Sequence, residues 1–261
     1  VINQPLQSFK KEVEEKTRGK LKVQIEIPGN IRETNQEAIK KTFEDVISGE
    51  IQMSQIYTSY MAQFDPNFHA LEMPFLFKDN EHSFAAVDGE PGLQLLASLE
   101  KNSPLKGLGF TYCGGYRSIA SMDLKLESVE DFSKIKMSFP SPMSKTIFVK
   151  MGATLVGNIS KESIQTALEK NDINSYETVS PRYFHNGEYK TAKVLNDLNH
   201  NIQFTTIVMN KIFFKSLTKK EQKIVSDAIF KASQVERSLA VQVATEVRIN
   251  AIKLGIAIVK M

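Results

Sequence analysis

The sequence has few of the features that mark disulfide-bonded, membrane-spanning or nucleic-acid-binding proteins. Its single cysteine, Cys113, excludes an intrachain disulfide and a cysteine-based zinc site. No apolar run reaches the roughly 18 residues that a membrane-spanning helix needs. Lysine and glutamate are interspersed along the chain, and the net charge is only +3. No basic stripe with interleaved aromatic residues stands out, so no nucleic-acid partner is predicted.

The sequence also lacks the short motifs of common active sites. The four histidines form no H-E-x-x-H pair, and there is no G-x-S-x-G elbow, phosphate-binding loop or G-x-G-x-x-G fingerprint. Cys113 is interpreted as a buried strand residue, because a free cysteine usually behaves as a small hydrophobic side chain. The sequence therefore predicts no metal site and no cofactor, and it gives an enzymatic function little support, although many active sites have no local signature.

The hydrophobic periodicity predicts an α/β protein. With 261 residues, the chain is long enough for two domains. Helical spacing alternates with period-two runs, which favours a largely parallel sheet. The first half is expected to form helices over 6–16, 35–49, 82–87 and 92–101, and strands over 21–27, 51–57 and 108–113.

A second block follows the glycine pair Gly114-Gly115. Its patterns predict strands over 134–139, 172–177 and 204–210, and helices over 143–152 and 160–171. Thr218 and Glu221 then form a T-x-x-E capping box before a helical pattern over about 218–254. A helix of that length is expected to run through both domains.

The order of these segments resembles the periplasmic solute-binding proteins of TRAP transporters, the DctP type. The segments "ISGEIQM", "LEMPFLFKD", "GGYRSI" and "SVEDFSKIKMSFP" match family motifs in order. "MGATLV", "ESIQTALEKNDINSYE", "LNH" and "VMNKIFFKSLTKKEQKIVSDA" continue the series over nearly the whole chain. No single motif is decisive, but their shared order and spacing is.

The resemblance implies two α/β domains around a ligand cleft, joined by crossing strands and the long helix. The expected domains are 1–115 plus 205–235 and 116–204 plus 236–261. Such a protein is extracytoplasmic or periplasmic and monomeric, performs no reaction, and delivers a small molecule to TRAP-type membrane subunits. The chain opens without an initiator methionine, and relatives extend beyond both of its ends, so it is expected to be processed or trimmed.

The resemblance also implies where a ligand would be held. Many relatives use an arginine in a "K-I-R-V-P" strand to bind a carboxylate through two hydrogen bonds. In "KIKMSFP" that position is Ser138, and Lys136 two residues earlier matches the family's lysine. Arg117 in "GGYR" aligns with a second family arginine, although a salt bridge near a hinge is the alternative. We therefore expect a ligand that the usual carboxylate–arginine clamp does not hold.

Four further positions are expected to face the ligand in relatives. Thr178 aligns with a ligand-binding asparagine, and Tyr57 and Tyr60 follow a cleft-facing strand. Ser160 aligns with a cleft position, or it caps its helix. Phe75 and Phe77 in "MPFLF" are instead expected in the core.

Two other functions use the same fold. A ligand-sensing or interaction module would explain the missing arginine and the altered turn before Ser175. An enzyme on a two-domain scaffold is the second alternative. Function depends on the site rather than on the fold, so the resemblance alone does not separate them.

Overall fold

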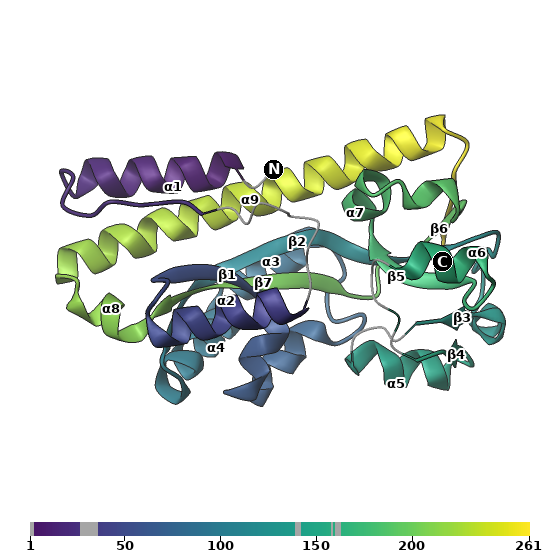
Figure 1. Ribbon diagram of the computed structural model, residues 1–261, viewed down its shortest axis with the longest axis horizontal. Coiled ribbons are helices and arrows are strands. Elements are labelled where there is room, and N and C mark those ends of the chain that lie inside the picture. Colours follow the sequence, from purple (N-terminus) through teal and green to yellow (C-terminus); the bar gives the residue numbers. More distant parts are fainter. Residues whose placement is uncertain (1–2, 27–35, 139–141, 158, 160–162) are drawn as a thin grey trace. The chain divides into compact units, whose positions relative to one another are not determined.

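The computed structural model describes residues 3–26, 36–138, 142–157, 159 and 163–261 (Figure 1). The chain divides into two compact units. Unit 1 comprises Val1–Phe68, Asp79–Cys113 and Phe204–Ala240, and unit 2 comprises His69–Lys78, Gly114–Gln203 and Val241–Met261. In this division residues 69–78 group with unit 2.

Unit 1 is built on three strands and the helices that cover them. Strand β1 (Met53–Tyr57) pairs antiparallel with β7 (Ile202–Asn210), which adjoins the first part of β2 (Leu105–Ser121). The helices are α1 (Asn3–Lys16), α2 (Gln36–Ser48), α3 (Asn80–Asp88), α4 (Glu90–Asn102), α8 (Lys211–Ser216) and the first part of α9 (Lys219–Lys253), with the 3₁₀ turn η1 (Thr58–Gln63) after β1. The 3₁₀ turn η2 (Pro66–Glu72) leads from unit 1 into unit 2.

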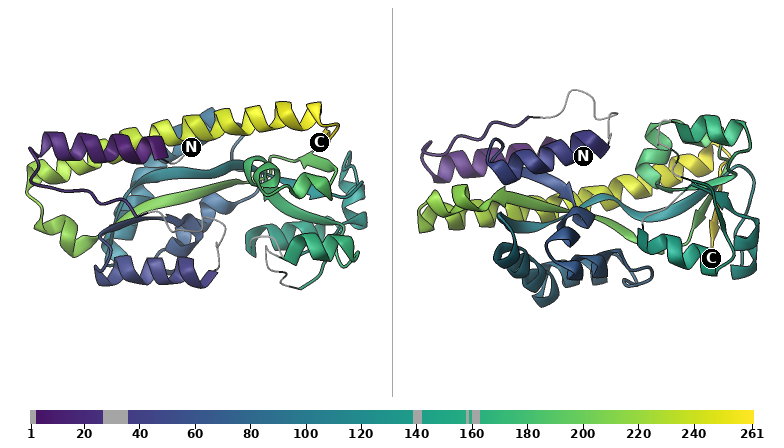
Figure 2. Two further views of the ribbon diagram at one scale, coloured as in Figure 1. Left: turned by 45° about the horizontal axis from the view of Figure 1, so that its top comes forward. Right: turned by 60° about the horizontal axis from the view of Figure 1, so that its bottom comes forward.

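Helix α1 packs along the first part of α9, as Figures 1 and 2 show. Phe9 and Val13 lie four residues apart on one face, and they share an apolar cluster with Val225 and Ile229 of α9. Lys231 of α9 also forms an ion pair with Glu12 of α1 at 2.9 Å. The apolar face of α1 therefore has its partner within unit 1.

The expected strand over 21–27 is not formed in its described part, which runs extended without ladder pairing. Its alternation is real, because Leu21 and Val23 pack against the α1–α9 cluster. The backbone instead bonds to side chains in and just after α1: Val23 N–H donates to Glu14 Oε1 at 3.0 Å, and Leu21 N–H donates to Thr17 Oγ1 at 3.2 Å. Alternation of apolar and polar residues indicates an extended chain with one buried side. It does not show that a neighbouring strand pairs with that chain.

Two side chains of α9 bind the backbone of β2 in unit 1. Glu236 accepts the Tyr112 N–H at 2.8 Å, and Arg237 donates to the Phe110 carbonyl at 2.6 Å. Arg237 is 1% exposed and also forms an ion pair with Asp88 of α3. Burial raises the pKa of Glu236 to about 7, although the Tyr112 hydrogen bond and the Arg237 charge act in the opposite direction.

The largely parallel sheet that the sequence predicts for the first half of the chain is not found among the described residues, because β1 and β7 pair antiparallel. Unit 2 contains a mixed sheet. The second part of β2 pairs antiparallel with β5 (Ser175–Val179) and with β6 (Val194–Asp197). Strand β3 (Lys136–Met137) pairs parallel with β4 (Thr154–Leu155) and β5, and β6 pairs parallel with β8 (Ala257–Lys260). Neighbouring strands run parallel where a helix connects them, as α5 (Pro142–Lys150) connects β3 and β4. The long strand β2 has antiparallel neighbours instead.

The two faces of the unit 2 sheet have separate cores. Ala120 and Tyr176 lie on one face, with helices α6 (Ile164–Glu169), α7 (Ser180–His185) and the end of α9. Ile119 and Met137 lie on the other face, with the 3₁₀ turn η3 (Val129–Lys134) and α5. The 3₁₀ turn η5 (Glu188–Lys190) follows α7. Because side chains alternate along a strand, this division decides the direction of each candidate site residue.

Candidate functional site

The register of β2 against β5 separates the candidate residues of unit 2. Arg117 lies opposite Val179, and Ser118 lies opposite Thr178. Arg117 and Glu177 therefore project from the Ile119 face, while Thr178 projects from the Tyr176 face. The two candidates that the sequence suggested as charged and polar ligand contacts point to opposite faces of the sheet.

Arg117 belongs to a buried charged cluster. Its guanidinium forms an ion pair with Glu177, whose other carboxylate oxygen contacts His200 Nε2 at 2.7 Å. The side chains of His200 and Glu177 are 1% and 5% exposed. Burial alone would raise the pKa of Glu177, but the Arg117 charge and the His200 hydrogen bond outweigh it and lower the pKa to about 2. Glu177 therefore stays ionised at neutral pH and offsets the charge of Arg117.

A second acid, Glu72, lies near this cluster. Burial raises its pKa, and the Arg117 charge offsets part of that effect. The Glu72 carbonyl accepts the Asn201 amide at 2.7 Å, and the Phe75 N–H donates to the His200 carbonyl. The segment 69–78 is thus bonded to unit 2 beside the buried cluster in which Glu177 compensates the charge of Arg117.

Phe75 is not part of the core, contrary to expectation. Its ring is 60% exposed and its backbone has φ of 61°, a conformation that is uncommon for bulky residues. Phe77 is buried as expected, and its carbonyl accepts the Tyr116 hydroxyl at 3.1 Å. The turn at Phe75 places this ring in solvent and returns the chain to the core at Phe77.

Thr178 lies in a different polar group, centred on Glu188. The Glu188 carboxylate accepts hydrogen bonds from Tyr176 at 2.8 Å, Thr178 at 3.3 Å and Asn186 at 3.1 Å. Arg182 forms an ion pair with it at 3.3 Å. The Thr178 hydroxyl therefore donates its hydrogen to an internal carboxylate. Its oxygen can still accept a further hydrogen bond.

Ser138 follows β3 and is 7% exposed. Its hydroxyl oxygen accepts the Ile159 N–H at 3.1 Å, and it lies 3.5 Å from the Ile159 carbonyl. Lys136, two residues earlier, is exposed, and its ammonium lies 3.5 Å from the Asn171 carbonyl. The Ser138 hydroxyl thus holds a neighbouring backbone segment.

The two tyrosines lie in unit 1 and are half-buried. Tyr57 ends β1, and the thiol of Cys113 lies 3.7 Å from its hydroxyl. Tyr60 packs edge-on against Phe43, with 5.7 Å between ring centroids. Ser160 lies outside the described residues. Arg117, Ser138 and Thr178 belong to unit 2, so the candidates divide between the units.

Sequence reasoning missed three residues of these groups. Glu177 and His200 occur in the quoted segments "SYE" and "LNH", but nothing local indicated that they pair with Arg117. Glu188 carried no signal at all, because its partner Thr178 lies on another element. In the described residues, no group of three metal-ligating side chains occurs, and no helix is long and apolar enough to cross a membrane.

Comparison with known proteins identifies the family. The family model described as bacterial extracellular solute-binding protein, family 7 (DctP), matches residues 1–261. A 2,3-diketo-L-gulonate-binding periplasmic protein of Escherichia coli is 26% identical over 88% of this chain and 68% of its own length. A C4-dicarboxylate-binding protein of Bacillus subtilis is 24% identical over 90% of this chain and 65% of its own length.

Solved structures share the fold. A TRAP periplasmic solute-binding protein from Ochrobactrum anthropi superposes with a TM-score of 0.89 at 21% identity, covering 98% of this chain and 78% of the other. A second, from Xanthobacter autotrophicus with bound β-D-galacturonate, has a TM-score of 0.82 at 24% identity, covering 98% and 84%. The family match over the whole chain, together with this fold, shows that the chain belongs to the bacterial extracellular solute-binding proteins of family 7, the DctP family of TRAP transporters.

Proposed function

We propose that this chain captures a small polar molecule and delivers it to the membrane subunits of a TRAP-type transporter. It acts in the periplasm as a monomer and catalyses no reaction. The sequence also suggested Thr178 as a ligand contact, but its side chain projects from the opposite face of the sheet to Arg117. The proposed ligand contacts are therefore Arg117, Ser138, Tyr57, Tyr60 and Ser160. Family membership supports the transport role, and the arrangement around Ser138 and Arg117 supports a particular kind of ligand.

The ligand is one that does not depend on a carboxylate–arginine clamp. The observation that carries this proposal is that Ser138 stands where the clamp arginine is expected, with its hydroxyl bonded to the backbone of Ile159. Arg117, the remaining candidate cation, already has Glu177 as an ionised partner. A carboxylate brought to Arg117 would meet a charge that Glu177 already compensates, and burying it there would be unfavourable.

Pairs of ligands that differ only in the acid group test the proposal. D-galacturonate and D-galactose form one pair, and orotate and uracil form another; two relatives of known structure were solved with bound galacturonate and orotate. Each compound is added to the purified chain, and the melting temperature is followed. Within any pair that stabilises the protein, we expect the uncharged compound to raise the melting temperature more than the acid does. Stronger stabilisation by the acids would refute the absence of a clamp.

The role of Arg117 needs a variant that preserves the local charge balance. Arg117→Met alone would leave Glu177 buried and unpaired, so the informative variant is Arg117→Met with Glu177→Gln. Ligand-induced stabilisation that persists in this double variant would exclude Arg117 as the main contact. Loss of stabilisation by an acid, with folding retained, would instead show that Arg117 holds the carboxylate.

A further inference from the structure

Two segments of unit 1 carry a large excess of positive charge. Residues 16–22 and 211–223 together carry nine basic side chains and one acidic side chain. Their net charge is +8, whereas the whole chain is +3, so the rest of the chain is net −5. The sequence separates these segments by almost 190 residues, which is why no basic stripe was visible before the fold was known.

The fold brings the two segments together. Leu21 and Leu217 belong to the same apolar cluster of unit 1. The charge of Lys20 contributes to lowering the pKa of Glu221, after the hydrogen bonds from Thr218. Figures 1 and 2 show the end of α1 beside the start of α9. The positive charges therefore gather at one end of the α1–α9 pair.

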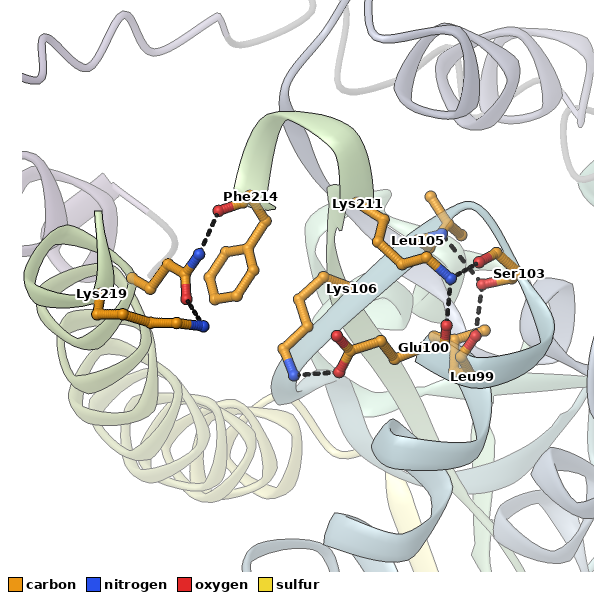
Figure 3. Close-up of polar contacts among 9 residues, drawn as sticks. Leu99, Glu100, Ser103, Leu105, Lys106, Lys211, Phe214 and Lys219 are labelled. Carbon is orange, nitrogen blue, oxygen red and sulfur yellow. Dashed lines mark hydrogen bonds and ion pairs between the residues drawn. The ribbon is translucent and has the colours of Figure 1, made fainter. Parts of the chain in front are cut away.

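Three lysines of this region are already used internally. Lys16 forms an ion pair with Glu12 at 2.6 Å, and Lys223 forms one with Asp227 at 2.8 Å. The Lys211 ammonium donates to the carbonyls of Ser103, at 2.7 Å, and Glu100, as Figure 3 shows. These three lysines do not contribute to an outward-facing positive surface.

Six basic residues remain exposed, and they form no ion pair within the described part of the chain. We name them the basic face: Arg18, Lys20, Lys22, Lys215, Lys219 and Lys220. Lys219 contacts the side chain of Gln222 at 3.3 Å, which leaves its charge uncompensated. Such a concentration of charge produces a local potential that attracts anionic partners.

Ile212 lies beside the basic face and is 80% exposed. It precedes Lys215 by three residues on α8, so the two side chains are neighbours on the helix surface. The opposite side of α8 is fixed by Phe214, whose ring lies 5.6 Å from the Lys106 ammonium, and Lys106 pairs with Glu100 at 2.5 Å (Figure 3). The helix is therefore anchored with an aliphatic side chain outward among lysines.

We propose that the basic face, with Ile212, docks on an anionic lipid surface. Five of its six charges are lysines, whose flexible point charges suit a layer of mobile headgroups better than the planar, bidentate recognition of fixed carboxylates that arginine favours. An exposed aliphatic side chain within a basic cluster matches the mode in which peripheral proteins insert between headgroups. This inference goes beyond solute binding, because it concerns where unit 1 rests while the protein meets its membrane partner.

Vesicle sedimentation tests the proposal. Vesicles of phosphatidylcholine with 30% phosphatidylglycerol are compared with pure phosphatidylcholine vesicles at about 50 mM and 500 mM NaCl. We expect binding only to the anionic vesicles, lost at the higher salt because screening shortens the range of the attraction. Each neutralised lysine should weaken binding about fivefold. The test variant is Lys215→Gln with Lys219→Gln and Lys220→Gln, for which we expect a loss of about a hundredfold.

A control variant that loses the same number of positive charges elsewhere distinguishes an effect of the basic face from an effect of the overall net charge. Lys150, Lys170 and Lys193 are exposed in unit 2, and their triple change to glutamine should leave vesicle binding unaltered. Ile212→Ser should weaken binding while its salt dependence remains. Equal loss in the test and control triples would overturn the proposal. Absence of binding to anionic vesicles at low salt would also overturn it, and an acidic protein surface would then be the occupant.

Discussion

The change Glu177→Gln tests the electrostatic account of the buried cluster in unit 2. It removes the charge that both Arg117 and His200 contact. The pKa of Glu177 is lowered from 4.5 to about 2, which corresponds to about 3 kcal/mol of stability at neutral pH. This agrees in size with the 3–5 kcal/mol expected when one partner of a buried ion pair is removed.

The pH dependence follows from the sign of this change. A carboxylate whose folded pKa is depressed contributes its full stability above the unfolded value of 4.5 and loses it as the pH falls toward 2. The difference in unfolding free energy between the wild type and Glu177→Gln should therefore be about 3 kcal/mol at pH 7 and about 2 kcal/mol at pH 3.5.

Urea denaturation at the two pH values measures these differences. Glu169→Gln in unit 2 is the matched control, because Glu169 is exposed and should change stability by less than about 0.5 kcal/mol. Adding Arg117→Met to Glu177→Gln should recover part of the loss, since the unpaired cation is removed. A loss below about 1 kcal/mol at pH 7, or one that does not shrink at pH 3.5, would refute the reasoning.

Three further changes test other parts of the structure. Burial raises the pKa of Glu236 to about 7, so its charge opposes folding increasingly as the pH rises from 4.5; Glu236→Gln should stabilise the protein at pH 8 by up to about 3 kcal/mol and have little effect at pH 4, as urea denaturation would show. Asn210 caps α8 through the Phe213 N–H and donates to two carbonyls of α2, so Asn210→Ala should cost about 1–3 kcal/mol, while Asn210→Asp, which keeps the cap but turns a buried carboxylate oxygen toward those carbonyls, should cost at least as much. Phe75→Gly should raise the free energy of unfolding by about 1 kcal/mol, and so raise the melting temperature slightly, because an exposed ring is lost and glycine adopts the positive φ without strain. A lower melting temperature would mean that the exposed ring makes a stabilising contact.

Local patterns were sufficient to predict some elements. The capping box at the start of α9 is confirmed, with Thr218 and Glu221 bonded at 2.7 Å, and α9 runs over Lys219–Lys253 close to the expected range. Such predictions succeed because capping and helical periodicity depend on residues three or four positions apart. The expected strand over 21–27 is not formed in its described part, where Leu21 and Val23 bond to the side chains of Thr17 and Glu14 rather than to another strand.

The candidate site was less predictable, because its contacts are distant in sequence. Arg117 and Glu177 are sixty residues apart, and only the β2–β5 register brings them together. The same register turns Thr178 to the opposite face, toward Glu188. A sequence pattern identifies residue types and their alternation, but it does not fix which strands are neighbours.

The central claim is that Ser138 removes the carboxylate clamp from a solute-binding scaffold. The most direct measurement is calorimetric titration of wild type and Ser138→Arg with the acid and neutral members of one ligand pair, such as D-galacturonate and D-galactose. Ser138→Met, which adds bulk without charge, is the matched control. The account predicts that the wild type prefers the neutral member and that only Ser138→Arg shifts the preference toward the acid, by about tenfold or more. Tighter binding of the acid by the wild type, unchanged in Ser138→Arg, would contradict it.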